Sequence, residues 1–281
     1  MSGHNLDLAE VEKIIDLALE EDVGKGDLTT ELLFTENIEC NAEIRCKESG
    51  VLAGLLIASE VFRKLDSSVE FSNFKSDGDT IAPGDVIMNI RGSQKHILTG
   101  ERLALNILQR LSGIATTTSA YVKAVEGHNV KIIDTRKTVP GMRVLSKYAV
   151  RVGGGYNHRI GLSDGILIKD NHIKLAGGIQ QAVAKIRQNL RCDLKIEVET
   201  SSLDQVEQSL KAGADIIMLD NMPDSLMKEA VCMIGGKALV EASGGITLER
   251  VRKVAKLGVD LISVGALTHS AQALDISLDM V

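Results

Sequence analysis

Three kinds of group that could bind a ligand or take part in catalysis follow the short apolar segments in the C-terminal half of the chain. The first two segments run into basic residues, in Asp134-Thr135-Arg136-Lys137 and Lys169-Asp170-Asn171-His172. The next two end in the carboxylates Glu199 and Asp220, and the last two run into Ser243-Gly244-Gly245 and Gly265-Ala266. Cations, carboxylates and free backbone amides together predict a site for a phosphorylated or carboxylated small ligand.

The basic residues are concentrated in one stretch. From Asp134 to Lys174 there are eight lysines and arginines against three aspartates, in a chain of net charge -6. A local cationic field in an acidic protein predicts a small polyanionic ligand rather than a polymer. We expect ligand contacts from four of these residues: Arg136, Lys137, Arg159 and Lys169. The other basic residues include a stripe four residues apart, Arg143, Lys147 and Arg151, whose spacing is typical of a solvated helix face.

The carboxylates at the ends of two segments could bind a metal ion or a sugar. Glu199 and Asp220 end successive segments, so they should face the same space as the cations and hold Mg²⁺ or bind sugar hydroxyls. The alternative is that they only neutralise neighbouring lysines. Glu197 would face the same side as Glu199. His158 and His172 flank the basic residues and are candidates for ligand contact or for a purely structural role.

The glycines indicate a phosphate site. Ser243-Gly244-Gly245 is followed by a helical pattern near Thr247, which places unpaired amide groups at a helix N-terminus. Such an end binds anions, because its free N–H groups and the helix dipole both favour negative charge. The alternative is a tight turn without a ligand, and Gly265 after the next segment makes that alternative weaker.

The apolar segments themselves predict a repeat of strand and helix. Strands are expected at Lys131–Ile133, Gly165–Ile168, Leu194–Val198, Ile216–Leu219, Ala238–Val240 and Leu261–Val264, and the last four begin 22 or 23 residues apart. Helical patterns between them cover Ile179–Leu190, Leu203–Lys211, Ser225–Met233 and Leu248–Lys256. This repeat predicts a parallel sheet, and its even spacing favours a closed or nearly closed α/β barrel of about six strands, with the site at the C-terminal strand ends.

The N-terminal part follows another plan. It combines helical patterns at 7–21 and Leu55–Leu65 with an alternating segment from Cys40 to Cys46 and short strands at Val69–Lys75 and Val86–Ile90. A long helical pattern from His96 to about Glu126 follows, with Gly113 as its expected break. We expect this helix to bridge two domains.

Composition excludes several classes of function. Aromatic residues make up 2% of the chain and tryptophan is absent, which argues against base stacking, and the pI of about 5.6 leaves no basic footprint for nucleic acid. No apolar run approaches the ~20 residues of a membrane span, and the first ten residues lack the features of a signal peptide. The four cysteines form no CxxC pair, as expected of reduced thiols in a cytoplasmic protein.

At these residues the sequence resembles the quinolinate phosphoribosyltransferase family. The resemblance covers nearly the whole chain and departs at none of the motif positions. Its segments run from Gly100-Glu101-Arg102-Leu103-Ala104-Leu105-Asn106 through Asp134–Gly141, Lys147–Val150, Gly153–Arg159 and Leu167–His172 to Val198-Glu199-Thr200, Leu219-Asp220-Asn221 and Ala242–Ile246.

The resemblance implies a fold and an activity. It implies an N-terminal α/β sandwich domain over 1–113, including the bridging helix, and an open, incomplete barrel over 114–281 whose last residues pack back on the first domain. Quinolinate and phosphoribosyl pyrophosphate would be the substrates, Mg²⁺ the cofactor, and nicotinate mononucleotide, pyrophosphate and carbon dioxide the products. A homodimer would share its active sites, with Arg102 reaching the neighbouring subunit's site.

Residue roles follow from the same resemblance. Catalysis would involve Lys137, Lys169, Glu199 and Asp220, of which Glu199 and Asp220 would also meet the metal. Substrate would be bound by these four residues and by Arg102, Thr135, Arg136, His158, Arg159, His172, Ser243, Gly244, Gly245, Gly265 and Ala266. The cations would stabilise the departing pyrophosphate and hold the dicarboxylate.

Three rival hypotheses remain open from the sequence. A Schiff-base aldolase would use Lys169 as its nucleophile, but it leaves Arg136 and Arg159 without a role. A carrier module is suggested by the turns Asp77-Gly78-Asp79 and Pro83-Gly84-Asp85, but no Lys-Met modification site stands beside them. A third rival keeps the transfer reaction and uses nicotinate as the acceptor, without decarboxylation.

Overall fold

The computed structural model describes residues 6–281 and divides the chain into two compact units. The first unit comprises Met1–Ser119, Thr138–Gly154 and Leu267–Val281, and the second comprises Ala120–Lys137 and Gly155–Ala266. The first unit therefore collects three stretches of sequence around one core. The second is formed by one nearly continuous stretch, as expected of a regular strand–helix repeat.

The first unit is built on a four-stranded antiparallel sheet of order β12-β1-β5-β3. Its strands are β1 (Glu39–Cys46), β3 (Glu70–Asn73), β5 (Val86–Ser93) and β12 (Ile276–Met280), and a smaller sheet pairs β2 (Gly50–Val51) with β4 (Thr80–Ile81). In β1 the alternate residues Ala42, Ile44 and Cys46 are buried, as a strand with one covered face requires. The register of Ile44 with Leu278 places the end of the chain in this sheet.

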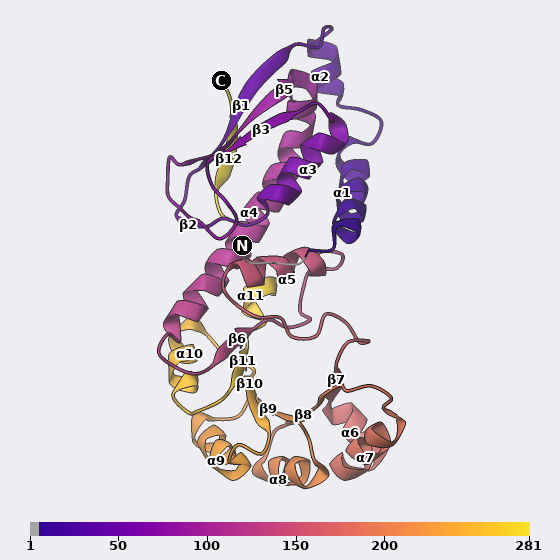
Figure 1. Ribbon diagram of the computed structural model, residues 1–281, viewed down its shortest axis with the longest axis vertical. Coiled ribbons are helices and arrows are strands. Elements are labelled where there is room, and N and C mark those ends of the chain that lie inside the picture. The colour runs from indigo at the N-terminus through magenta and orange to yellow at the C-terminus, as the bar shows by residue number, and fades with distance from the viewer. Residues whose placement is uncertain (1–5) are drawn as a thin grey trace. The chain divides into compact units, whose positions relative to one another are not determined.

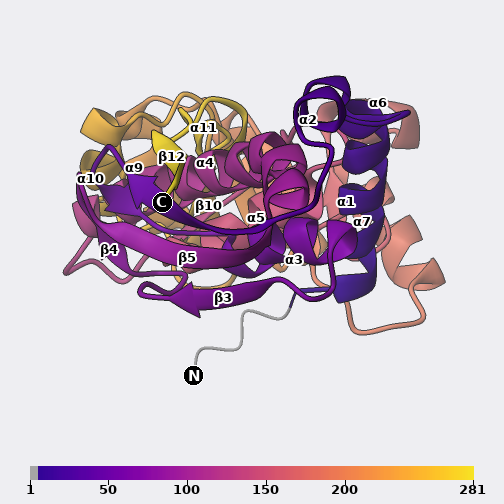
Figure 2. The same ribbon diagram turned by 90° about the horizontal axis from the view of Figure 1, so that it is seen from above.

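Helices cover one face of this sheet, as Figure 2 shows for α3 (Leu55–Leu65). The Phe62 and Phe71 rings lie 6.3 Å apart, which joins α3 to β3. Lys64 of α3 forms an ion pair of 2.9 Å with Asp16 of α1. The remaining helices of the unit are α1 (Leu8–Val23), α2 (Leu28–Leu33), α5 (Arg143–Val152), α11 (Ala266–His269) and most of α4 (Gln94–Ala124).

Two expectations for these helices are wrong. Gly113 does not break α4; the helix continues through it, and a Cβ there would lie 1.8 Å from the carbonyl oxygen of Gln272. The glycine therefore allows the backbone of residues 272–273 to approach the helix. The stripe on α5 is not a solvated face, because Lys147 is 1% exposed and lies among buried neighbours on that helix.

The second unit is an all-parallel six-stranded sheet of order β6-β11-β10-β9-β8-β7. The strands are β6 (Lys131–Ile133), β7 (Ile166–Ile168), β8 (Ile196–Thr200), β9 (Ile216–Asp220), β10 (Leu239–Ser243) and β11 (Leu261–Ser263). Strands β6 and β7 form the two edges of this sheet. The expected open, incomplete α/β barrel of about six strands is therefore confirmed.

Helices follow the strands of this sheet, and Figure 1 shows α8 and α9 along its outer side. Their bounds are α6 (Asp170–Ala176), α7 (Ile179–Asn189), α8 (Leu203–Ala212), α9 (Asp224–Ile234) and α10 (Leu248–Ala255). The buried residues Val198 of β8 and Ala242 of β10 each lie between two polar neighbours, and Leu219 of β9 lies between Met218 and Asp220. One face of each strand thus supplies an apolar layer, and the other supplies the polar side chains described below.

Two further observations concern the described part of the chain. None of its helices combines the length and the apolar character that crossing a membrane requires. Its four cysteines, Cys40, Cys46, Cys192 and Cys232, are free thiols.

Candidate active site

The polar side chains of the second unit meet at the C-terminal ends of its strands. The parallel register pairs Leu167 with Glu197, Glu199 with Met218, and Ser243 with Asp220. Alternate residues of neighbouring strands consequently face the same space, a cavity of about 540 Å³. It is lined by Thr135, Arg136, Lys137, His158, Arg159, Leu167, Lys169, Glu199, Met218, Asp220, Asn221, Glu241, Ser243, Gly244, Gly245 and Ser263.

Most of the predicted site residues therefore share one cavity, and four lie elsewhere. His172 is in the first turn of α6, where its Nδ1 accepts a hydrogen bond of 3.0 Å from the backbone N–H of Lys169. Gly265 and Ala266 follow β11 outside the cavity lining. Arg102 is an exposed residue of α4 in the first unit.

The cations line the part of the cavity formed by the ends of β6 and β7 and the loop before β7. The Nη1 of Arg159 donates to the carbonyl of Gly165 at 2.9 Å, while its buried Nε has no hydrogen-bond partner among the described residues. Burial and the nearby charge of Arg136 lower the pKa of Arg159. Two guanidinium groups brought together in this way favour an anion between them, and a carboxylate matches their paired donors.

Lys169 is held by one of the carboxylates. Its Nζ lies 3.0 Å from Oε2 of Glu199, with the two side chains 47% and 19% exposed. A Schiff-base nucleophile needs its amine free to attack a carbonyl, and here the Nζ is engaged with the Glu199 carboxyl group. The pair therefore favours an electrostatic role for Lys169 over the aldolase hypothesis.

The glycine turn after β10 is shaped by its neighbour after β9. Asn221 has a positive φ of 53°, its N–H donates to the carbonyl of Ser243 at 2.9 Å, and its Nδ2 donates to Asp220 at 2.9 Å. Gly244 has φ 88°, and a Cβ there would lie 2.3 Å from the Asn221 side chain. Only glycine fits this close approach, which leads into α10 through its N-cap Thr247.

Glu199 and Asp220 provide the donors that a magnesium ion prefers. They end the neighbouring strands β8 and β9 and line the same cavity. Mg²⁺ is usually bound through one or two carboxylates together with water and substrate phosphates, so this pair fits the ion beside the glycine turn.

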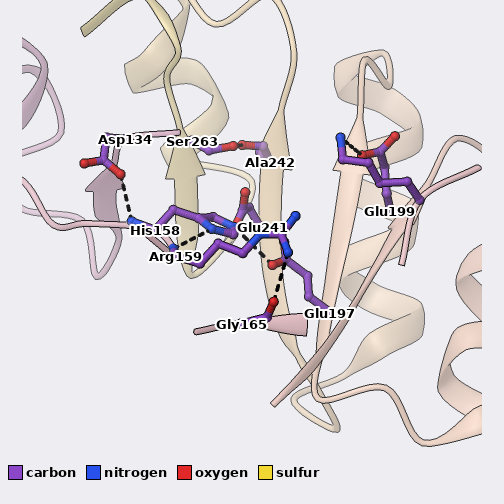
Figure 3. A network of polar contacts seen from close by, with 10 residues as sticks. Asp134, His158, Arg159, Gly165, Glu197, Glu199, Glu241, Ala242 and Ser263 are labelled. Carbon is purple, nitrogen blue, oxygen red and sulfur yellow. Dashed lines mark hydrogen bonds and ion pairs between the residues drawn. The ribbon is translucent and has the colours of Figure 1, made fainter. Parts of the chain in front are cut away.

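A buried network lies beneath these residues, and Figure 3 shows it. The Nε2 of His158 is 3.0 Å from Oε2 of Glu197 and 3.7 Å from Oε2 of Glu241. Burial and the charge of Glu197 raise the pKa of Glu241 to about 8. The sequence predicts that Glu197 lies on the inner face. It does not predict five residues that line the cavity: Glu241, Asn221, Met218, Leu167 and Ser263. A carboxylate in the middle of the apolar strand Leu239–Ser243, two residues before Ser243, was the available signal for Glu241.

Comparison with known proteins agrees with this geometry. The profile of the quinolinate phosphoribosyl transferase N-terminal domain matches residues 27–112, and that of the C-terminal domain matches residues 114–279. The chain is 46% identical over 271 residues to a probable nicotinate-nucleotide pyrophosphorylase [carboxylating] of Bacillus subtilis, covering 96% of this chain and 93% of that protein. It is 44% identical over 266 residues to the protein of the same description from Synechocystis, covering 94% and 90%.

Solved structures give the same result. NadC from Streptococcus pyogenes superposes with a TM-score of 0.94 at 43% identity, covering 99% of each chain. The nicotinate-nucleotide pyrophosphorylase of Francisella tularensis has a TM-score of 0.94 at 41% identity, covering 99% of this chain and 98% of that one. A cavity built from the expected strand ends, two matching domain profiles and these relatives lead to one conclusion: the chain belongs to the quinolinate phosphoribosyltransferase family.

Proposed function

We propose that this protein transfers the phosphoribosyl group of phosphoribosyl pyrophosphate to the ring nitrogen of quinolinate, with loss of carbon dioxide. The products are nicotinate mononucleotide, pyrophosphate and carbon dioxide, a step of NAD biosynthesis. The observation that carries the proposal is the single cavity in which Arg136, Arg159 and Lys169 face Glu199, Asp220 and the Gly244–Gly245 turn. The relatives named for this reaction support the same substrates.

Each part of the cavity suits one part of the reaction. The amide groups of Gly244 and Gly245 and the N-terminus of α10 suit a phosphate. Arg136, Arg159 and His158 surround a place for the dicarboxylate. Lys137 and Lys169 offset the charge of the departing pyrophosphate, and the carboxylates offset the positive charge that develops on the sugar. Fixed charges of both signs around one carbon stabilise such a transition state without a covalent nucleophile.

Magnesium is the proposed cofactor, and Glu199 and Asp220 would hold it. When bound, it would neutralise pyrophosphate oxygens as the bond to the sugar breaks. Thr135, Ser243 and Asn221 are polar neighbours in the same lining and suit phosphate or ribose hydroxyl groups.

The proposed assembly is a homodimer in the cytoplasm. Arg102 is exposed on α4 although it belongs to the family-like segment Gly100–Asn106, which supports a role at a neighbouring subunit's site. The scattered free thiols suit a reducing compartment.

A turnover assay tests the proposal directly. Purified protein is incubated with phosphoribosyl pyrophosphate, Mg²⁺ and either quinolinate or nicotinate, and pyrophosphate and carbon dioxide are measured. Quinolinate should give both products in equal amounts, and nicotinate should give neither. Comparable turnover with nicotinate would refute quinolinate as the substrate. Turnover that continues at the same rate after Mg²⁺ has been chelated would refute magnesium as the cofactor.

A further inference from the structure

The second unit contains another cavity at the opposite ends of its strands. It has a volume of about 470 Å³ and is lined by residues that begin strands, among them Lys131, Ile166, Ile216 and Leu261. His158, Arg159 and Glu241 line both this cavity and the substrate cavity. These three residues therefore form a floor that separates the two spaces.

The floor is held in place by hydrogen bonds within its own loop and with Asp134, which follows β6. Asp134, which is fully buried, accepts bonds from Nδ2 of Asn157 at 2.6 Å and from the N–H of His158 at 2.9 Å. The N–H of Arg159 donates to Nδ1 of His158 at 2.8 Å. The Nε2 of the same ring faces Glu197, 3.0 Å from its Oε2.

The two carboxyl groups below His158 are deeply buried. Glu197 is 4% exposed and Glu241 is 1% exposed. Oε1 of Glu197 and both carboxyl oxygens of Glu241 have no hydrogen-bond partner among the described residues. The groups that face Glu241 are Glu197 on β8, His158 on the floor loop and Ser263 on β11, while Arg159 lies near Glu197. Burial and the nearby charge of Glu197 therefore both favour the protonated form of Glu241.

The proposed reaction needs a proton donor. When the carboxylate next to the ring nitrogen leaves as carbon dioxide, its bonding electron pair stays on the ring carbon, and that carbon must then gain a proton. Arginines do not release protons in proteins, and the Nε2 of His158 is engaged with Glu197 at 3.0 Å. Among the described groups that line the substrate cavity, the remaining donors are Glu241 and the ammonium groups of Lys137 and Lys169.

We propose that Glu241 supplies this proton and regains it from the second cavity, so that the floor of the barrel is a proton relay; the proposal rests on the decarboxylating transfer proposed above. The bond from the ring carbon to the carboxylate breaks, and the Glu241 proton forms the new C–H bond. Glu241 is left as a carboxylate beside Glu197, and it takes up a proton from the bulk solvent through the second cavity, so that one solvent proton is consumed in each turnover. His158 is a positioning residue, because its Nε2 lies 3.0 Å from Oε2 of Glu197 and orients that carboxyl group beside Glu241.

Glu241→Gln tests the donor, because an amide keeps the shape of the side chain and has no acidic proton. Pyrophosphate, carbon dioxide and nucleotide products are measured together, the nucleotides by mass. We expect carbon dioxide release to fall at least about tenfold and the nucleotide that retains both carboxylates to accumulate. Glu229→Gln, the same change on the exposed side of α9, is the matched control and should behave as wild type.

Two outcomes of this experiment would overturn the relay. Carbon dioxide release at the wild-type rate in Glu241→Gln would assign the donation to a lysine. A stoichiometric metal ion in the purified protein that Glu241→Gln loses would instead make His158, Glu197 and Glu241 a metal site, since their ligand atoms lie within 4.8 Å of one another. A wild-type protein that fails to turn over quinolinate would refute the proposed function itself, which keeps the two failures distinct.

Ile216→Trp tests whether Glu241 regains its proton through the second cavity. Ile216 lines only the second cavity, so a larger side chain there narrows the path of reprotonation without changing any group of the substrate cavity. In rapid-quench experiments the first turnover, which uses the stored proton, should keep the wild-type rate, and the following turnovers should slow. Equal rates in all turnovers, or equal slowing of the first and later ones, would contradict the route.

Discussion

At the scale of single residues, Lys169 gives the sharpest test of the cavity. Lys169→Met removes the ammonium group that pairs with Glu199 at 3.0 Å. We expect turnover to fall about a hundredfold, because one preorganised charge contact typically contributes that much to a rate. Folding should persist, since the side chain is 47% exposed. Pyrophosphate release and thermal melting measure the two effects.

The control for this change lies on the neighbouring helix. Lys174 is an exposed residue of α6 outside the cavity lining, so Lys174→Met removes the same charge from the same region. Its turnover should equal that of wild type. If Lys169→Met kept its rate within about threefold, the cation would have no part in the reaction.

Glu241 also makes the stability of the fold depend on pH. Its pKa in the folded protein is about 8, above the value of about 4.3 for an exposed glutamate. Between these values the folded state keeps a proton that the unfolded state has lost, so the free energy of unfolding falls as pH rises. Glu241→Gln should remove this slope. Urea unfolding of both proteins from pH 5 to pH 8 measures it, and identical slopes would mean that Glu241 is ionised throughout.

The sequence identifies residues of the site where they stand at strand ends or, for His158 and Arg159, within the run of basic residues. Lys169, Glu199 and Asp220 follow apolar segments, and the rule that barrel sites form at the C-terminal ends was enough to bring them together. Glu241 lies inside a strand, where a carboxylate has no expected partner, and its role depends on Glu197 of another strand. The part that Asn221 plays depends on its contact with Gly244, and only the three-dimensional structure shows that contact.

At the scale of elements, Gly113 shows how a helix depends on a distant segment. Gly113→Ala would place a Cβ 1.8 Å from the carbonyl oxygen of Gln272, and the backbone of residues 272–273 would have to move. We expect a loss of about 1–3 kcal/mol in the free energy of unfolding, as for other overpacked sites, although alanine favours helices. Urea denaturation measures it.

A matched alanine substitution on the same helix separates packing from helix propensity. Thr117 is half-exposed on α4, so Thr117→Ala should leave stability unchanged or raise it slightly. An equal gain from both substitutions would show that the segment at Gln272 yields without cost and that Gly113 has no packing role.

The elements of the second unit were easier to predict than their contacts. Local periodicity gives the strands, because short apolar segments recur between helical patterns and can be recognised without contacts from elsewhere. Local periodicity could not predict that glycine is needed at position 113, because the contact that requires it is with Gln272, 159 positions away. Nor could it predict the burial of Lys147 on α5. The pairing of β12 with β1 likewise joins opposite ends of the chain, a contact that no local pattern encodes.

At the scale of the whole molecule, the prediction concerns whether two subunits complete one site. The cavity is lined entirely by residues of the second unit, while Arg102 belongs to the first. A dimer that shares its sites predicts complementation between two inactive variants, Arg102→Ala and Lys169→Ala. Mixed under conditions that exchange subunits, they form heterodimers in which one site carries both substitutions and the other carries neither.

The expected size of this effect follows from the statistics of pairing. Half of the dimers in an equal mixture are heterodimers with one intact site of two, so activity should recover to about a quarter of wild type. The control mixes Lys169→Ala with Glu199→Gln, whose substitutions lie in the same cavity lining, so that no pairing restores an intact site. Pyrophosphate release before and after exchange measures both mixtures. Recovery in neither mixture would place Arg102 outside the partner's site. In the heterodimer the Lys169→Ala subunit still carries Arg102, so an arginine that completes the neighbouring cavity would restore the site of the Arg102→Ala subunit.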